Sequence, residues 1–243
     1  MTKSNNIPSF LYTDDFNFDN LIKLRADINN SNKSDKSQVK LTFMPFVIKA
    51  VSLSLKEFPE INSFSSDKRD DQNIITEFTI KKDHNISIAM DTPNGLLVPN
   101  IKAVQTKSVF RIQKDLTELR DKALSLKLSS SDLSDGTFSI SNIGPVGGKV
   151  LAPCILPPQV AIMAMGKIWD SIRIITKEDK ENHNHESLQR FKSGPYHGVL
   201  FHKAMTMSIS ADHRIIDGAS VAKFAELLRL YIEQPLKIIT ADS

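Results

Sequence analysis

The sequence predicts a layered fold of mixed helices and strands, of the α/β or α+β class. In several long segments apolar residues recur at three- and four-residue spacing, as in amphipathic helices, and in shorter segments they alternate with polar residues, as in strands. The two kinds of segment follow one another along the whole chain, without an internal repeat. Because 40% of the 243 residues are hydrophobic and 24% are charged, the chain can bury a substantial core.

The N-terminal part predicts two helices separated by polar loops. Asp19 can cap a short helix with inward-facing Leu21, Ile22, Leu24 and Ile28. The polar residues 29–38 then predict a loop. Pro45 lies in the first turn of a second, largely buried helix, which Pro59 ends. A further loop is expected at residues 65–73.

A hairpin and the clearest amphipathic helix of the chain come next. ISIAMD at residues 86–91 and LLVPNI at residues 96–101 flank the turn signal TPNG, which predicts a hairpin. In the helix the apolar residues recur every three or four positions, and the opposite face is charged. Its predicted buried residues are Val109, Ile112, Leu116, Leu119, Ala123 and Leu126.

Two alternating segments and a last helix complete the chain. GTFSISNIG, residues 136–144, alternates apolar residues with serines and predicts a half-buried strand that ends in a glycine-rich turn. MTMSISADH alternates likewise and brings His213 to the far end of a strand. A helix is predicted from Gly218 until Pro235, and its buried side contains Val221, Phe224, Leu227, Leu228 and Tyr231.

Charge and cysteine content exclude several classes of protein. The net charge of +3 comes from scattered basic residues, which argues against a nucleic-acid partner. The only cysteine, Cys154, allows no intramolecular disulfide and no multi-cysteine metal site, and favours a reducing compartment. Its neighbours in APCILPP are apolar, so Cys154 is expected to lie in the core rather than to carry an acyl group.

No membrane, targeting or metal-binding segment is expected. Three prolines interrupt the longest apolar stretch, residues 150–169, and the polar start MTKSNN lacks a signal-peptide pattern. The polar residues 170–200 predict a flexible surface insertion. His183 and His185 lie in it without acidic or cysteine partners at ligand spacing, so no metal site is predicted.

His213 is the clearest candidate for catalysis. It follows a predicted strand, and Asp217 and Gly218 come shortly after it at the start of a helix, which is the kind of position where catalytic groups gather. On position alone, a surface or packed histidine is the commoner outcome. Asp217 also has structural alternatives, because it could cap the last helix or pair with Arg214 or Arg25.

Longer motifs, ordered along nearly the whole chain, point to one family. They read IPSFLYTDDFNFDNLIKLR, KLTFMPFVIKA, NISIAMDTPNGLLVPNIK, DGTFSISNIGPVGG, PPQVAIMAMGKI and SADHRIIDGASVAKF. This series resembles the inner-core catalytic domain of the dihydrolipoamide acyltransferases of 2-oxo acid dehydrogenase complexes. Within that family KLTFMPF, AMDT and SNIG followed by GG look most like the branched-chain type. The resemblance implies a single catalytic domain over residues 1–243, with a chloramphenicol-acetyltransferase-like mixed sheet flanked by helices.

The resemblance also implies an activity and its catalytic residues. The enzyme would transfer an acyl group, such as isobutyryl, between dihydrolipoamide and coenzyme A. His213 would be the general base that deprotonates the CoA thiol, and Ser141 would bind the oxyanion of the tetrahedral intermediate. Asp217 matches a further catalytic position and would hold the loop and the imidazole in place. His213 and Ser141 would meet across a subunit interface of a homotrimer, and the trimers would pack as an octahedral core.

The expected CoA contacts come from the same resemblance. They are Arg25, Thr42, Asp91, Ser141, Asn142, Gly166 and Ile168. The guanidinium of Arg25 suits a phosphate group, because its paired donors match phosphate oxygens. The sequence differs from the branched-chain pattern at Thr42, which replaces a serine, and at Arg120, which can be glutamine there. The role of Arg120 therefore stays open, and no metal is implied.

Other parts of the complex are expected to lie outside this sequence. Full-length family members carry a lipoyl domain and a subunit-binding domain, and neither is seen here. The lipoyl group would therefore be carried outside this chain, and decarboxylase and dihydrolipoamide dehydrogenase subunits would bind through the missing domains. The expected location is the mitochondrial matrix in a eukaryote or the cytoplasm in a bacterium. The alternatives are acetyl or succinyl transfer in the pyruvate or 2-oxoglutarate complex, an inactive core scaffold, and antibiotic acetylation.

Overall fold

A mixed seven-stranded sheet forms the centre of the computed structural model, which describes residues 7–31, 40–66, 68, 70–71, 75–176, 188–190 and 196–241. The strand order is β1-β11-β9-β8-β4-β7, and β10 pairs with β11. β8 runs parallel to both of its neighbours, whereas the other pairings are antiparallel. The strands are β1 (Ser9–Asn17), β4 (Ile86–Ile88), β7 (Asn100–Ile101), β8 (Phe138–Asn142), β9 (Ala161–Thr176), β10 (Leu188–Arg190) and β11 (Tyr196–Asp212). The predicted fold class is confirmed.

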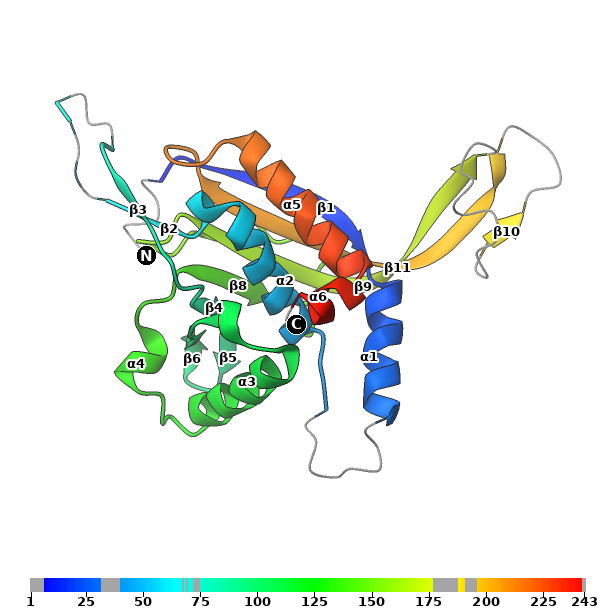
Figure 1. Cartoon of the computed structure of the whole chain (residues 1–243), viewed down its shortest axis with the longest axis horizontal. Coiled ribbons are helices and arrows are strands. Elements are labelled where there is room, and N and C mark those ends of the chain that lie inside the picture. The colour runs from blue at the N-terminus through cyan, green and yellow to red at the C-terminus, as the bar shows by residue number, and fades with distance from the viewer. Residues whose placement is uncertain are drawn as a thin grey trace.

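Helices α2 and α5 pack side by side against the sheet and enclose the core (Figure 1). Their bounds are Met44–Glu57 and Gly218–Glu233, and α5 also contacts β1. Pro45 lies in the first turn of α2, and Pro59 follows its end, as predicted. The other helices are α1 (Asp19–Ser31), α3 (Val109–Leu124), α4 (Ser130–Leu133) and α6 (Leu236–Thr240), and the 3₁₀ turns are η3 (Pro59–Ile61) and η4 (Val104–Thr106).

The predicted hairpin is confirmed and extends over two sheets. β4 pairs with β7 in the main sheet, and between them β5 (Met90–Thr92) pairs with β6 (Gly95–Leu97). Gly95 has a φ of +108° in the turn, a conformation that favours glycine. A second small hairpin joins β2 (Ser63–Ser65) and β3 (Phe78–Ile80) near the predicted loop at residues 65–73.

The first strand, β1, is an element that the sequence analysis missed. It pairs with β11 along its whole length, from Ser9 opposite Asp212 to Asn17 opposite Ala204. Its exposure alternates, but two acidic residues in the middle of the run hide that pattern in the sequence. Asp19 is the first residue of α1 rather than the residue before it, and its carboxylate accepts a hydrogen bond from the backbone N of Lys203 (2.9 Å).

Three predictions of burial also need correction. Leu126 is 63% exposed because α3 ends at Leu124 and Leu126 has a φ of 58°. The predicted half-buried strand β8 is also buried at Ser139, because β8 lies inside the sheet rather than at its edge. The Ser139 hydroxyl donates to Oε1 of Gln159 (2.6 Å). Cys154 is exposed, since the loop that contains it is not part of the sheet.

The expected insertion at residues 170–200 begins and ends in paired strands. The distal parts of β9 and β11 form a ribbon that projects from the body of the molecule (Figure 1). Residues 177–187, which include His183 and His185, and residues 191–195 lie outside the described part. Within the residues that the structure describes, none of the helices has the length and apolar character of a membrane span. The apolar stretch at residues 150–169 forms a loop followed by the start of β9.

Candidate functional site

His213 lies in the turn that follows β11, at the end of the sheet where β1 begins. Its side chain is exposed, and its backbone N donates to the carbonyl oxygen of Pro8 (2.9 Å). The imidazole packs against the Phe10 ring, with 4.7 Å between ring centroids. The predicted position at the far end of a strand is thus observed, with one side of the ring supported and the rest accessible.

Asp217 caps α5 rather than contacting the imidazole. Its carboxylate accepts a hydrogen bond from the Ser220 backbone N (2.6 Å) at the start of α5. This bond to the amide, strengthened by further contacts at the helix start, lowers the pKa of Asp217. Within the described chain no hydrogen bond joins Asp217 to His213, so the capping alternative matches the geometry.

Ser141 and Asn142 end β8 in the interior of the sheet. Ser141 is half-buried and lies opposite Ala164 of β9. The amide of Asn142 donates to the sulfur of Met44 (3.5 Å), and its side-chain oxygen accepts from the Gly144 backbone (3.0 Å). These contacts fix the Asn142 side chain at the point where the chain leaves the sheet.

Ser141 and His213 are far apart within one chain. Ser141 is level with Ala164 of β9, which is level with Ser208 of β11. His213 lies five residues further along, or about 16 Å, and β11 is two strands away from β8, or about 10 Å, so the separation is roughly 19 Å. A hydrogen-bonded reaction centre cannot include both residues of the same copy.

A pocket of about 730 Å³ lies between α3, the β5–β6 hairpin and the start of α2. It brings together Thr42, Asp91 and Asn142, three of the predicted CoA contacts. The backbone N and the hydroxyl of Thr42 both donate to Oε1 of Gln113 (2.8 and 2.9 Å), which anchors this wall to α3. Arg120 also lines the pocket and provides a cationic group there.

The other predicted CoA residues lie beside this pocket rather than in its lining. The Arg25 guanidinium stacks on the ring of Phe43, 4.3 Å from its centroid, and Phe43 lines the pocket. Among the residues that the structure describes, the Nε atom of Arg25 is buried without a hydrogen-bond partner. Ile168 is half-buried against the core. A Cβ atom on Gly166 would lie 2.0 Å from the Lys149 carbonyl oxygen, so this position admits only glycine without a backbone shift.

Several residues that line the pocket were not predicted from the sequence to belong to the site. Gln113, Leu116, Thr117 and Arg120 share one face of α3, at helical spacing, and all line the pocket. Their periodicity was visible in the sequence, but which part of the helix faces a pocket depends on tertiary packing. In the described ranges, no cluster of three or more histidine, cysteine, aspartate or glutamate residues could hold a metal ion.

Comparison with known sequences gives consistent matches over nearly the whole chain. The family model described as the catalytic domain of 2-oxoacid dehydrogenases acyltransferase matches residues 1–240. The lipoamide acyltransferase components of the mitochondrial branched-chain alpha-keto acid dehydrogenase complexes of Caenorhabditis elegans and Bos taurus are each 41% identical over 97% of this chain. The pyruvate dehydrogenase acetyltransferase component of Mycoplasma pneumoniae is 35% identical over 99% of it. The chain spans 46%, 43% and 54% of these three relatives.

Solved structures show the same architecture. The cubic core of a pyruvate dehydrogenase multienzyme complex matches with a TM-score of 0.79 and 29% sequence identity. The match covers 98% of this chain and 86% of the chain in that structure. A truncated catalytic core of the 2-oxoacid dehydrogenase complex from Thermoplasma acidophilum has a TM-score of 0.72 at 30% identity, with coverage of 97% and 92%. A chloramphenicol acetyltransferase, 12% identical with a TM-score of 0.54, shares the fold and covers 95% of this chain and 92% of its own.

Proposed function

Because the chain belongs to the 2-oxoacid dehydrogenase acyltransferase family, as the catalytic-domain match over residues 1–240 shows, we propose that it transfers an acyl group between dihydrolipoamide and coenzyme A. We infer further that the acyl group is a branched-chain one such as isobutyryl. Three relatives that are 41% identical are named for the branched-chain complex, whereas a relative named for the pyruvate complex is 35% identical, and this difference supports the assignment.

The proposed reaction begins with removal of the proton from the CoA thiol. An ordinary thiol has a pKa near ~8.5, so only a few per cent is thiolate at neutral pH, and a nearby base increases that fraction during attack. His213 is the proposed base, and its exposed ring is accessible to a thiol. The sulfur then attacks the thioester carbonyl of the acylated dihydrolipoyl group, and the tetrahedral intermediate collapses with release of the lipoyl thiolate, which takes up the proton.

The tetrahedral intermediate carries a negative oxygen that needs a hydrogen-bond donor. Ser141 is the proposed donor, because its hydroxyl lies half-buried at the end of β8, beside the Asn142 that lines the pocket. One such donor typically lowers the barrier by about 3 kcal/mol. The resemblance of the SISNIG segment to the family motif supports this role.

The observation that carries the mechanism is the strand register, which places Ser141 on β8 and His213 beyond the end of β11, two strands away; strand spacing then puts them roughly 19 Å apart within one chain. If both residues act on the same intermediate, they must come from different copies. We therefore propose a homotrimer in which each site uses Ser141 of one subunit and His213 of the next. The cubic core among the similar structures supports further packing of trimers into an octahedral particle.

Coenzyme A is proposed to enter the pocket between α3 and the start of α2. Thr42, Asp91 and Asn142 supply polar groups there, and Met44 and Met205 supply apolar surface for the pantetheine chain. Arg25, stacked on Phe43 at the edge of the pocket, keeps donors for a phosphate group. Gly166 and Ile168 would contribute backbone contacts from β9, and no metal takes part.

The remaining components are proposed from the relatives. The lipoyl group would be supplied from outside this sequence, and the decarboxylase and dihydrolipoamide dehydrogenase subunits would complete the complex. Relatives named as mitochondrial support a location in the mitochondrial matrix, if the source is a eukaryote. Acetyl transfer is the second candidate, favoured by the 35% identity to acetyltransferase components of pyruvate dehydrogenase complexes.

A panel of acyl donors tests the proposal. Isobutyryl-, isovaleryl-, acetyl- and succinyl-CoA are compared with free dihydrolipoamide as acceptor, using the wild type, His213→Ala and Ser141→Ala. The wild type is expected to prefer isobutyryl or isovaleryl groups, and Ser141→Ala to lose about 100-fold in kcat. A preference for acetyl or succinyl groups would overturn the branched-chain assignment. Unchanged activity of His213→Ala would overturn the mechanism, and no transfer with any donor would leave the scaffold alternative.

A further inference from the structure

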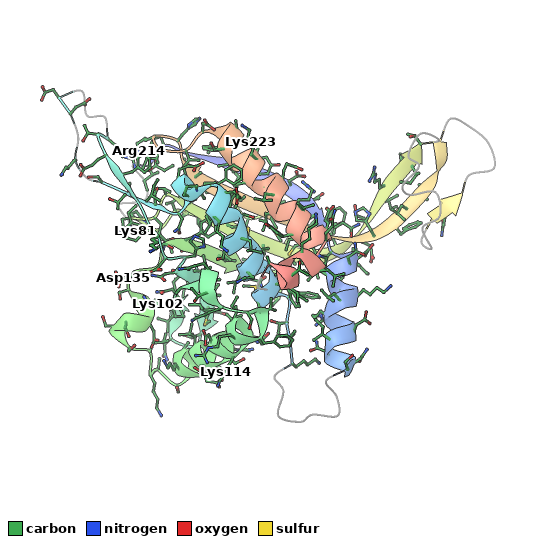
Figure 2. The ribbon with its side chains drawn as sticks, in the orientation of Figure 1. Lys81, Lys102, Lys114, Asp135, Arg214 and Lys223 are labelled. Atoms are coloured by element: carbon green, nitrogen blue, oxygen red, sulfur yellow. The ribbon has the colours of Figure 1, made fainter. Side chains whose placement is uncertain are left out.

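His213 lies in the sequence between two residues, Asp212 and Arg214, that form an ion pair with each other. The fully buried carboxylate of Asp212 accepts hydrogen bonds from three nitrogen atoms of Arg214: the backbone N (3.1 Å), Nε (2.8 Å) and Nη2 (2.6 Å). Figure 2 shows Arg214 at the end of the sheet that lies opposite the β9–β11 ribbon. We propose that Asp212 and Arg214 form a positioning clamp that fixes the direction of the His213 side chain, an inference that rests on the base role proposed above.

The backbone around the pair makes a tight turn. Asp212 donates its N to the Val160 carbonyl oxygen (2.9 Å), and its own carbonyl accepts from the backbone N atoms of Ile215 (3.1 Å) and Ile216 (2.9 Å). His213 is therefore the first residue of the turn, held also by its bond to the Pro8 carbonyl. Since the His213 side chain is itself exposed, its direction must come from how this turn is held.

The conformation of the turn depends on Arg214 because the Asp212 side chain is buried. Its exposed fraction is 0%, whereas that of the Arg214 side chain is 20%. A buried carboxylate without its partner is strongly unfavourable, so the turn would rearrange to hydrate Asp212 if the guanidinium were removed. Such a rearrangement would move the imidazole, and a displacement of about 1 Å can lower a catalytic rate about 100-fold.

Arg229 offers a matched control in the same protein. Its side chain is 22% exposed and joins α5 to β1 by pairing with the Asp14 carboxylate and donating to the Asp15 carbonyl oxygen (2.5 Å). Asp14 pairs with Met207 in the sheet, five residues before Asp212, or about 16 Å along the strand. The two arginines have similar burial and chemistry, and only Arg214 flanks His213.

The test compares kcat and the KM for CoA in assembled enzymes. The single variants are Arg214→Gln, Arg214→Lys, Arg229→Gln and Asp212→Asn, and the double variant combines Asp212→Asn with Arg214→Gln. Arg214→Gln is expected to lower kcat by about 30-fold while the KM for CoA changes by less than about twofold. Arg214→Lys keeps the charge but loses the paired donors, and should lose about fivefold. Arg229→Gln should stay within about twofold, and the double variant should be no worse than Arg214→Gln.

Three outcomes would overturn the clamp. The first is an assembled Arg214→Gln enzyme with the kcat of the wild type, and the second is an equal loss of kcat in Arg214→Gln and Arg229→Gln. The third is a double variant whose loss of kcat is the product of the losses in Asp212→Asn and Arg214→Gln. If Arg214→Gln fails to assemble, Arg214→Lys decides, and a wild-type kcat there also overturns the proposal. The His213→Ala variant separates the two hypotheses. If it is active, the base role fails, whereas if it is inactive and Arg214→Gln is active, the clamp alone fails.

Discussion

Two variants of low activity should form a more active enzyme when they assemble together. Ser141→Ala removes the proposed oxyanion donor but keeps His213, and His213→Ala does the reverse. In an oligomer of either variant alone, every site lacks one of the two residues. If each site combines Ser141 of one subunit with His213 of the next, an oligomer that contains both variants regenerates some intact pairs.

The size of the recovery follows from symmetry. In a closed ring of randomly mixed subunits at equal amounts, an interface has an intact serine with probability one half and an intact histidine with probability one half, so about one quarter of the sites are intact. Trimers selected to contain both variants have about one third of their sites intact. A site within one chain predicts no recovery, but the separation of roughly 19 Å between the two residues excludes such a site.

The assay uses the two variants co-expressed with different affinity tags and purified over both. Transfer from isobutyryl-CoA to dihydrolipoamide is then measured per assembled subunit. The control mixes the two variants after separate assembly, so that they share no interface, and should show only the activity of the single variants. Assembled mixed oligomers that are no more active than this control would refute the composite site.

Substitutions at three further residues test the supports of the site and of the core. Gly166→Ala should lower the free energy of unfolding by about 2 kcal/mol or more and raise the KM for CoA, because the added Cβ meets the Lys149 carbonyl oxygen; an unchanged melting temperature would contradict the contact. Asp217→Asn keeps a helix cap and should stay within about threefold of the wild-type kcat, whereas Asp217→Ala should lose more activity and thermal stability; equal losses would show that the charge is required. Burial lowers the pKa of His84 to about 4, so the fold prefers the neutral ring, and the stability that this contributes is present above pH 6.5 and lost as the pH falls toward 4. The free energy of unfolding should therefore decrease by about 2 kcal/mol between pH 7 and pH 5, less so in His84→Asn, and equal pH dependence in urea titrations would count against this assignment.

Most individual helices and strands were predictable, because the spacing of apolar residues differs between a helix and a strand. The helix at residues 109–124 and the hairpin around Gly95 follow from spacing and turn residues. The predicted burial of Leu126 was wrong, since the helix ends at Leu124 and helix ends depend on backbone geometry beyond the apolar pattern. β1 was missed because an alternating strand with acidic residues resembles a polar loop.

The arrangement of the site was less predictable than its residues. His213 at the end of a strand and Ser141 in an alternating segment were found in the sequence, but spacing could not show that β9 separates their strands. Arg120 and Gln113 enter the pocket through the orientation of α3, which is a tertiary property. The same holds for Asp217, because a carboxylate before a helix can cap it or contact a neighbouring side chain, and the choice between these depends on the tertiary structure.

The distance between Ser141 and His213 has a genetic consequence under the proposed trimer. A subunit that lacks both residues contributes a defective serine to one interface and a defective histidine to another. One such subunit would therefore inactivate about two of the three sites in its ring. A doubly defective allele should behave as a partial dominant negative, whereas an allele defective at one of the two residues removes a single site for each copy incorporated.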